Sequence, residues 1–494
     1  MTSTQAPKPQ APIVVQENPT LLQRVFSFHA MLIAGLALVA VLTVSTRFND
    51  PDLWFHLKLG QVIWTTHSIP STDIFSFTVY GQPWTAHEWL AELSIFAAYH
   101  AGGYTGLMFW LAGLTSILLG LSYFLCYRYC GNRLVSLLGA LCVLFFGTVG
   151  LAIRPLLLGH IFLVLELILL TLGARNRRWL WALPPLFAVW VNCHGSYFFG
   201  MAVLFASFIS SLVDGQWGLI VAERCDRNRQ KQFGIVLLLS AAALCCNPVG
   251  FRLLWYPLDA LLYQHTGLNA VEEWLPPDLR SVRALAMIAV VVLLLTTPLL
   301  RRAELRLLDL ILVAMAFWLS LQHVRMLFLF GIVVSPLLCQ ALAPLVGEDR
   351  KSHHPIANAI VIIGLLTAAA WAFPAVGVLN EQAQKGNPSG AVAFIRQAGL
   401  TGPMLNEYVF GDYLIWAMPE EKVFIDGRAD VFDWAGVFAE YGRWATLQED
   451  PNVLLDKYHI RLCVLSSRSP LGRVMPYLGW RKAFSDATAS VFVR

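Results

Sequence analysis

The stretch Arg47–Trp89, RFNDPDLWFHLKLGQVIWTTHSIPSTDIFSFTVYGQPWTAHEW, decides the fold and directly follows the first long apolar run of the chain. It opens on an Asp-Pro-Asp set formed by Asp50 and Asp52, and it closes on the pair His87-Glu88. Carboxylates beside a bilayer cost free energy unless they are solvated, paired or bound to a ligand. The stretch is therefore the first candidate for a functional site, and we expect the apolar segments to build a membrane-embedded body around it.

The composition is typical of a membrane protein. Of the 494 residues, 57% are hydrophobic and 13% are charged, and the mean hydropathy is +0.60. Soluble domains carry about 25% charged residues, so the chain is predicted to be an α-helical polytopic membrane protein. The nine cysteines include no Cys-x-x-Cys pair, which gives no sign of a zinc site. The net charge of +4 is scattered, and no Walker A sequence is present.

The apolar segments predict a membrane domain over residues 23–379, preceded by a disordered cytoplasmic tail over residues 1–22 that is rich in Pro, Gln and Thr. A helix needs about 20 residues to cross a hydrocarbon core of about 30 Å. Several apolar runs are shorter, so we expect them to extend into their flanks. The spans, about 11 in number, are Phe26–Thr46, Tyr104–Tyr127, Leu134–Ile153, Leu156–Ala174, Leu180–Val191, Phe198–Val213, Phe233–Cys246, Val282–Leu300, Leu307–Leu321, Met326–Val346 and Ile356–Val378.

Basic residues in the short loops predict the orientation. Clusters such as Arg175–Arg178 and Arg224–Lys231 all fall on one side of the membrane if every span is real. That side is predicted to be the cytoplasm, in a plasma (inner) membrane. The N-terminus then lies inside, and residues 380–494 lie outside.

The polar clusters fall on the opposite, external side in the same count of spans. Chance would have divided them between the two faces, so we interpret them as lining one external cavity. They are Asp50, Asp52, His56, His87, Glu88, Glu92, Arg154, Asn192, His194, Glu272, Glu273, His323 and Arg325.

The long first external loop, residues 47–103, is too patterned to be a linker. Apolar positions between Leu53 and Ile63 predict a short helix in the membrane interface, with Trp54 and Trp64 at headgroup depth. The segment from His87 onward predicts a second amphipathic helix. We expect the loop to pack on the helical bundle.

Residues 380–494 alternate helical and strand patterns, which predicts a small external α/β domain. Asp426-Gly427-Arg428 follows a predicted strand, a common place for a ligand-binding loop, although a structural Asp–Arg pair explains it nearly as well. The predicted helices are Ser389–Gly399 and Asn452–Tyr458, and the predicted strands are Pro403–Asn406, Lys422–Ile425, Arg461–Leu465 and Ser490–Val493.

The motif Asp50-Pro51-Asp52-Leu53-Trp54-Phe55-His56 resembles the acid motif that GT-C glycosyltransferases place just outside their first span. Protein O-mannosyltransferases have Asp-Glu there, and oligosaccharyltransferase catalytic subunits have Asp-Pro-Trp-Phe. The chain is more similar to a group of uncharacterised bacterial membrane proteins that combine this motif with His-Glu-Trp, Asn-x-His-Gly and Phe-Ile-Asp-Gly-Arg. These three motifs stand here at His87–Trp89, Asn192–Gly195 and Phe424–Arg428, so the likeness covers nearly the whole chain.

The resemblance implies sugar transfer, with inversion, from a polyprenyl-phosphate-linked donor to a glycan, lipid or protein acceptor on the external face. Such a reaction needs a carboxylate to accept the proton of the acceptor and donors on the departing phosphate. Asp52, with Asp50 and Glu88 as the other candidates, is the expected base. The expected substrate- and phosphate-binding residues are His56, His87, Arg154, Asn192, His194, Glu273, Trp274, His323 and Arg325.

Each role has a simpler alternative. Asp50 could cap the helix that follows it, Arg154 could reach for lipid headgroups, and Trp274 could be an interfacial anchor. A divalent cation, Mg²⁺ or Mn²⁺, could bind Asp50 and Asp52, whereas an unmetallated base would need only one carboxylate. A transporter or flippase of lipid-linked glycan or small molecules, and a non-catalytic scaffold that binds envelope glycan, also remain open.

Overall fold

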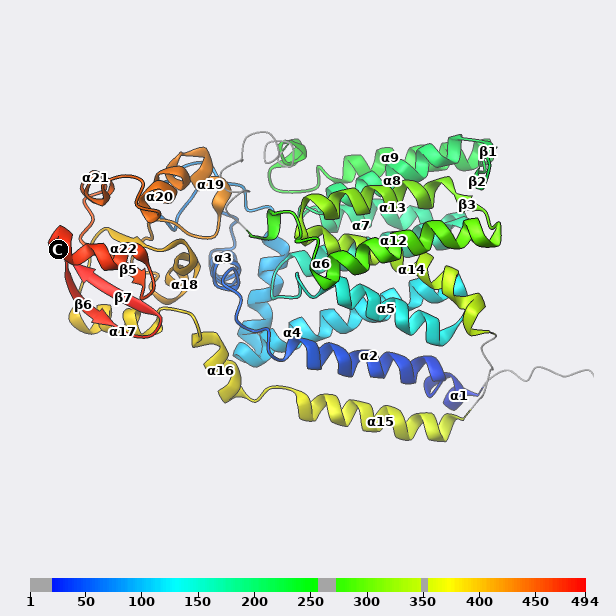
Figure 1. Ribbon diagram of the computed structural model, residues 1–494, viewed down its shortest axis with the longest axis horizontal. Coiled ribbons are helices and arrows are strands. Elements are labelled where there is room, and N and C mark those ends of the chain that lie inside the picture. Colours follow the sequence, from blue (N-terminus) through cyan, green and yellow to red (C-terminus); the bar gives the residue numbers. More distant parts are fainter. Residues whose placement is uncertain (1–19, 256–271, 348–353) are drawn as a thin grey trace, which may run out of the picture.

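The computed structural model describes residues 20–255, 272–347 and 354–494. A helical bundle forms one part of the elongated molecule and a smaller α/β domain forms the other, as Figure 1 shows. We call the end of the bundle beside this domain the domain end, and the opposite end the far end. Most of the predicted disordered tail lies outside the described residues, and the first element is the short helix α1 (Leu21–Val25).

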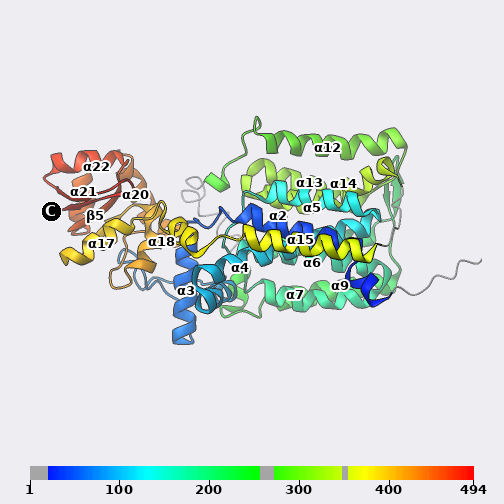
Figure 2. The same ribbon diagram turned by 90° about the horizontal axis from the view of Figure 1, so that it is seen from below.

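The bundle helices run roughly parallel to the long axis of the molecule, as Figures 1 and 2 show. Among the described residues, six helices are long and apolar enough to cross a membrane, and three shorter helices are apolar. The number of spans therefore stays a prediction. The bundle helices are α2 (Phe28–Val44), α4 (Trp89–Cys130), α5 (Arg133–Gly147), α6 (Leu156–Arg175), α7 (Leu183–Trp190), α8 (Tyr197–Leu212), α9 (Arg227–Ala243), α12 (Val282–Arg301), α13 (Leu307–Gln322), α14 (Leu327–Val346) and α15 (Pro355–Ala372).

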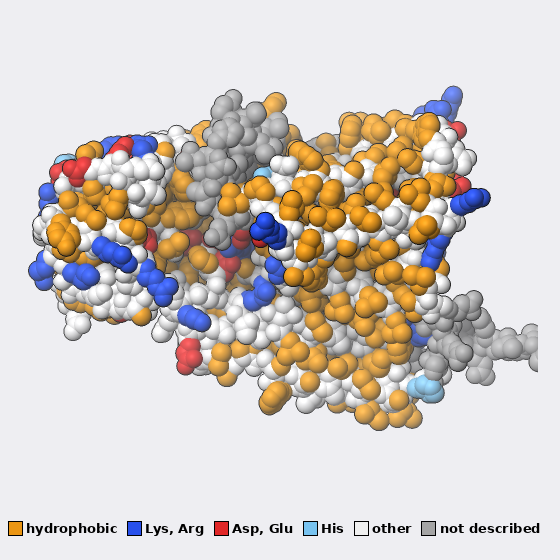
Figure 3. Space-filling model, in the orientation of Figure 1, with side chains coloured by type: hydrophobic (Ala, Val, Ile, Leu, Met, Phe, Trp, Pro, Cys, Tyr) orange, Lys and Arg blue, Asp and Glu red, His pale blue; other side chains and the backbone are white. Residues whose placement is uncertain are grey.

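Small residues let the central helices approach closely. A Cβ added at Gly331 of α14 would lie 2.9 Å from Phe146 of α5, and one at Gly147 would lie 2.7 Å from Phe328. Lipid tails are as apolar as leucine, so such close packing, and not water exclusion, holds membrane helices together. The outer faces remain apolar, as the space-filling view in Figure 3 shows across the bundle.

Helix α4 bends at Gly102 and Gly103, which have non-helical backbone angles. Gly103 has a φ of 57°, in the left-handed region that favours glycine. The bend separates an outer segment from the remainder, which packs against α2, α5 and α6. The predicted amphipathic helix after His87 and the predicted span Tyr104–Tyr127 are thus two parts of one bent helix.

Helix α3 (Leu53–Thr66) confirms the predicted short helix of the first loop, but Trp54 packs inside the protein and does not face outward as an interfacial anchor would. The Trp54 side chain is 2% exposed and meets Tyr104 and Tyr413 edge to face, with ring centroids 6.2 and 5.1 Å away. Helix α3 packs between α4 and α18 (Tyr408–Ala417) of the C-terminal domain. Trp64, by contrast, is exposed.

The C-terminal domain contains the predicted α/β arrangement. Its four strands lie in the order β4, β5, β7, β6, with β4 and β5 parallel and the other two pairs antiparallel. The helix α16 (Val376–Gln384) connects it to the bundle. The other elements are α17 (Ser389–Ala398), β4 (Met404–Asn406), α19 (Ala429–Trp434), α20 (Val437–Ala445), α21 (Pro451–Lys457), β5 (Leu462–Ser466), α22 (Pro470–Val474), β6 (Arg481–Ser485) and β7 (Ala489–Val493).

The predicted strand Lys422–Ile425 is wrong. Val423, Phe424 and Ile425 are buried, but the segment makes a single bridge, between Val423 and Ser76 of the first loop. Its other edge is held by the side chain of Asn406, which accepts from the Phe424 N–H at 2.8 Å and donates to the Ile425 carbonyl at 2.8 Å. The first loop and one amide side chain occupy the edges where neighbouring strands would pair.

A second, small sheet lies at the far end of the bundle (Figure 1). Its strands are β1 (Gly215–Trp217), β2 (Ile220–Ala222) and β3 (Leu305–Arg306). Strand β2 pairs antiparallel with β1 and parallel with β3, which ties the loop after α8 to the start of α13.

Candidate functional site

Arg154 holds three carboxylates at the domain end of the bundle. Its Nε lies 2.9 Å from both oxygens of Asp50, and its Nη1 lies 3.0 Å from Asp52 Oδ2 and 3.0 Å from Glu273 Oε1. The carboxylates come from the segment before α3 and from the short turn Glu272–Trp274. Three segments distant in sequence therefore meet at one guanidinium.

Burial alone would lower the pKa of Arg154, but Asp52, Asp50 and Glu273 together raise it above its usual value. The guanidinium stays charged and its charge is matched locally. Asp50 is 8% exposed and also accepts the backbone N–H of Asp52 at 3.0 Å. Asp50 thus orders the turn before α3 and pairs with Arg154, but it does not cap the helix as the alternative expected, because the N-cap residue is Asp52 and no side chain caps α3. The Asp52 side chain is 41% exposed and can meet a substrate.

A second cluster of His56, Glu88 and Glu92 lies beside the first. Glu88 immediately precedes α4 and Glu92 lies one turn into it, while His56 comes from α3. His56 Nδ1 lies 3.0 Å from Glu92 Oε1. Glu88 Oε1 lies 3.4 Å from His194 Nε2 and 3.7 Å from His87 Nε2. The structure thus brings together five of the polar residues that were predicted to be external: His56, His87, Glu88, Glu92 and His194.

Burial decides the charges in this second cluster. It lowers the pKa of His56, and it raises the pKa of Glu88, against the opposing effect of the nearby His87. A neutral imidazole is the form that binds a metal. Potential ligand atoms of His56, Glu88 and Glu92 lie within 4.8 Å of one another. Glu92 Oε2 is also buried without a hydrogen-bond partner.

This donor set fits a divalent cation better than the predicted pair of Asp50 and Asp52. The oxygens of that pair lie against Arg154, whose positive charge would repel a second cation. One imidazole nitrogen with carboxylate oxygens suits Mn²⁺ or Zn²⁺ more than Mg²⁺, which prefers oxygen ligands alone. The residues that could hold a cation are therefore His56, Glu88 and Glu92.

Asn192 and His194 lie on the turn between α7 and α8. The amide of Asn192 accepts from Trp89 Nε1 at 2.7 Å and donates to the carbonyls of Ala188 and Cys246, each at 2.8 Å. These contacts occupy the side chain, so its geometry favours bracing the turn over contacting substrate. His194 Nδ1 accepts the Ser196 N–H at 2.9 Å, which leaves Nε2 to donate toward Glu88.

Trp274, His323 and Arg325 form a third group at the same end. His323 Nδ1 lies 2.6 Å from the Trp274 carbonyl, and the Arg325 guanidinium carbon lies 4.4 Å over the Trp274 ring. Arg325 also interacts electrostatically with Glu273, Arg154 and Glu88. Trp274 thus contacts His323 and Arg325 within the protein, and Arg325 lies near the carboxylates of Glu273 and Glu88.

Arg428 braces the C-terminal domain against the first loop. Its guanidinium lies 2.5 Å from Asp73 and 2.6 Å from Asp426, among aromatic rings that include Trp84. Arg428 is 6% exposed. Of the two alternatives for Asp426-Gly427-Arg428, the structural Asp–Arg pair is the correct one.

Sequence reasoning placed Glu92 in the external cavity but gave it no chemical role, and it missed the partner of Arg428. Glu92 stands four residues after Glu88, so both carboxylates fall on one helical face, a signal that the sequence does contain. Asp73 lies among turn-forming residues and has no such pattern. Its pairing with Arg428 joins positions 355 residues apart.

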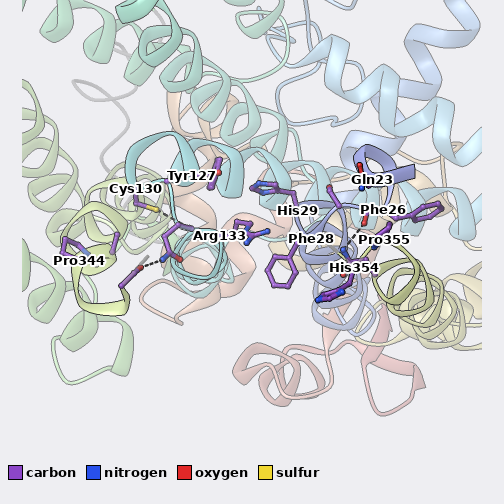
Figure 4. A pocket seen from close by; sticks show the side chains of 16 residues that line it. Gln23, Phe26, Phe28, His29, Tyr127, Cys130, Arg133, Pro344, His354 and Pro355 are labelled. Atoms are coloured by element: carbon purple, nitrogen blue, oxygen red, sulfur yellow. Dashed lines mark hydrogen bonds between the residues drawn. The ribbon is translucent and has the colours of Figure 1, made fainter. Parts of the chain in front are cut away.

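The larger cavities lie away from this site. One of about 770 Å³ is at the far end, between the starts of α2, α5 and α15 and the ends of α4 and α14. Figure 4 shows its lining, which includes His29, Tyr127 and Arg133. A smaller cavity of about 110 Å³ borders His87 at the domain end. Size alone therefore does not locate the site, and the converging charged side chains do.

The arrangement of a helical bundle, a long first loop and a C-terminal α/β domain is that of a polytopic membrane protein with the GT-C glycosyltransferase fold. The archaeal oligosaccharyltransferase AglB from Archaeoglobus fulgidus, in complex with an inhibitory peptide and a dolichol-phosphate, is similar with a TM-score of 0.58 and 12% identity, over 90% of this chain and 70% of that one. The same oligosaccharyltransferase in the apo form gives 0.56 and 12% identity, over 89% and 69%.

A second relative in structure is ArnT from Cupriavidus metallidurans, bound to undecaprenyl phosphate. It has a TM-score of 0.52 and 13% identity, over 94% of this chain and 97% of that chain. No family model matches the sequence, and no curated protein matches it by sequence. These likenesses support the GT-C fold that the acid motif predicted.

Proposed function

We propose that the protein transfers a sugar from a polyprenyl-phosphate-linked donor to an acceptor at the domain end of the bundle. The observation that carries the proposal is the exposure of Asp52. Of the two aspartates that Arg154 holds, Asp50 is buried and Asp52 is open. The similar proteins AglB and ArnT were solved with a dolichol-phosphate and with undecaprenyl phosphate, which fits a lipid-linked donor.

Asp52 is the proposed base. Its carboxylate accepts a proton from the nucleophilic atom of the acceptor as this atom forms a bond to the anomeric carbon of the sugar. The bond between the anomeric carbon and the lipid phosphate breaks at the same time. The attack comes from the face opposite the phosphate, so the configuration inverts. Arg154 holds Asp52 in place, and its three carboxylate partners make it a poor phosphate ligand.

Arg325 is the proposed partner of the departing phosphate. Negative charge develops on the phosphate as the bond breaks, and a guanidinium binds two phosphate oxygens in its planar fork. No carboxylate among the described residues lies within ion-pair distance of Arg325, so its charge is available. Trp274 holds the guanidinium from one face, with the ring centroid 4.4 Å away.

A divalent cation at His56, Glu88 and Glu92 is part of the proposal. When bound, it would supply positive charge that polarises a phosphate oxygen. The roles of Asp52 and Arg325 do not depend on it. The basic far-end loops predict that the domain end faces outside the cytoplasm, so the acceptor would be met on the external face.

Mass analysis of envelope glycans tests the proposal. Cells that lack the protein should lose one glycan modification, and wild-type protein should restore it. Asp52→Asn should not, because loss of a general base costs about 10²–10⁴ in rate. Asp278→Asn is the matched control, since Asp278 is an exposed domain-end carboxylate outside the site. Full restoration by Asp52→Asn would remove Asp52 as the base.

A further inference from the structure

A cavity at the far end of the bundle has no part in the proposed reaction. It measures about 420 Å³ and lies between the last turns of α4, α6 and α8 and the first turns of α9 and α13. Ligand pockets usually measure about 300–1,000 Å³. The cavity is thus large enough to accept a small polar headgroup.

The lining of this cavity is strongly basic. It includes two carboxylates, Glu223 and Asp309, against four guanidinium groups from four segments of the chain. Two of the arginines are half-buried and two are exposed. The arginines are Arg128, Arg229, Arg175 and Arg306.

Arg306 interacts electrostatically with Asp309, and Arg229 with Asp226, so the charge of the four arginines is only partly offset within the part of the chain that the structure describes. There, the side chains of Arg128, Arg175 and Arg306 have no hydrogen bond and no ion pair, and the Nε of Arg128 is buried without a partner. Arg229 donates instead to the Gly173 and Ala174 carbonyls at the end of α6, each at 3.3 Å. A buried donor without an acceptor costs free energy, which indicates that an acceptor arrives from outside.

The walls of the cavity change from basic to apolar. Ser207 and Ser210 add hydroxyl groups, whereas Leu167, Phe233 and Leu312 are apolar. A charged head beside a hydrocarbon chain matches this division. Basic pockets between transmembrane helices commonly bind phosphate headgroups, and the planar fork of arginine suits two phosphate oxygens.

We infer that this far-end cavity binds the phosphate group of a membrane lipid, with its headgroup among the arginines and its chains along the apolar wall. The inference is independent of the sugar-transfer proposal, because no residue is shared between the two sites. The phosphate could belong to a phospholipid, to a polyprenyl phosphate or to free phosphate, and the experiment separates these sources.

The test measures ligand binding to the full-length protein in neutral detergent. The probes are phosphatidylglycerol, undecaprenyl phosphate, inorganic phosphate and, as a comparator without phosphate, diacylglycerol. Arg306→Gln and Arg128→Gln should each weaken phosphatidylglycerol binding about tenfold, the expected loss of one charge-assisted contact. Arg227→Gln should stay within about twofold, because Arg227 is exposed two residues from Arg229 and outside the cavity lining.

Ser210→Glu supplies a variant that keeps every arginine. The added carboxylate should repel a phosphate, so its binding should fall as in Arg306→Gln. A loss confined to undecaprenyl phosphate identifies a polyprenyl lipid as the source. A loss confined to inorganic phosphate identifies the free ion and overturns the assignment to a membrane lipid. Unchanged binding of all three phosphate probes in Arg306→Gln and Ser210→Glu overturns the inference. Equal binding of diacylglycerol also overturns it.

Discussion

Arg325 and Arg154 show how neighbouring residues of one type divide into different roles. Arg154 is surrounded by carboxylates, whereas Arg325 stacks on Trp274 and keeps its charge available. Arg325→Ala should therefore weaken binding of a polyprenyl-phosphate sugar and turnover together, by about 2–4 kcal/mol, the range for loss of one donor to a developing anion. Binding measured on purified protein checks this expectation, with the exposed domain-end Arg280→Ala as control. If Arg325→Ala bound the donor within twofold of wild type, Arg325 would not bind the donor phosphate, and its role would be to contact membrane lipid headgroups.

The residues of the site could be named from the sequence, but their pairings could not. Asp50, Arg154 and Glu273 were each predicted to line one external cavity. Their meeting depends on the turn Glu272–Trp274 reaching the start of α6 from 119 positions away. The sequence pattern therefore suggested that Arg154 holds phosphate, and only the geometry shows its charge already matched.

At the scale of elements, the fit of α3 against α4 depends on Gly60. A Cβ there would lie 2.3 Å from the Glu92 carbonyl and 2.7 Å from Phe96. Gly60→Ala should push the helices apart and cost about 1–3 kcal/mol of stability, the usual cost of overpacking. Gly113→Ala in α4 is the matched control, because nothing lies within 4 Å of the added Cβ. Because alanine has a higher helix propensity than glycine, Gly113→Ala should instead raise the stability by up to about 1 kcal/mol.

Thermal unfolding of the two glycine variants in detergent measures this difference. Equal unfolding temperatures would show that α3 is not held by close contact with α4. Because Glu92 contacts His56 on α3, Gly60→Ala should also lower turnover, whereas Gly113→Ala should not.

A buried carboxyl in α18 gives the C-terminal domain a pH-dependent stability. Burial, with the nearby Asp426, raises the pKa of Asp412 well above its usual value, although its Oδ1 accepts the Gly427 N–H at 2.8 Å. The folded state thus holds this proton more tightly than the unfolded state. Its contribution is fully present below the ordinary carboxyl pKa of about 3.9 and declines as pH rises toward the higher folded value.

Asp412→Asn should therefore gain stability relative to wild type as the pH rises, since the amide keeps the acceptor for Gly427 and removes the charge. Unfolding temperatures of both proteins across the acidic to neutral range give the comparison. The exposed N-cap change Asp450→Asn serves as control because Asn caps a helix as well as Asp does. A difference between Asp412→Asn and wild type that stays constant with pH would contradict the expectation.

Elements whose apolar residues recur with a helical or strand period could be predicted from the sequence. Elements whose structure depends on contacts with distant segments could not. The spans and α17, α21, β5 and β7 follow apolar patterns of helical or strand period. Lys422–Ile425 has strand-forming residues, yet Asn406 and the first loop occupy its edges. Trp54 has the composition of an interfacial anchor, and α18 covers it instead. Contacts over long sequence separations decide both outcomes.

At the scale of the whole molecule, the two ends of the bundle carry different charged side chains. The candidate site with its acids and histidines lies at the domain end. Basic residues lie at the far end of the bundle, where Figure 3 shows Lys and Arg beyond the apolar surface, and others lie on the C-terminal domain. This asymmetry predicts that the far end is cytoplasmic, and it places the sugar-transfer site and the lipid-phosphate cavity on opposite faces of the membrane.

Cysteine labelling with a membrane-impermeant reagent in intact cells tests that orientation. The native Cys246 is exposed at the domain end, where its carbonyl binds the Asn192 amide. An Arg227→Cys change places a thiol at the exposed start of α9, the helix whose other end lies three residues before Cys246. In a background without other cysteines, Cys246 should react before lysis, and the cysteine at position 227 only after it. The reverse pattern would place Asp52 and Arg325 in the cytoplasm, where an external acceptor could not reach them.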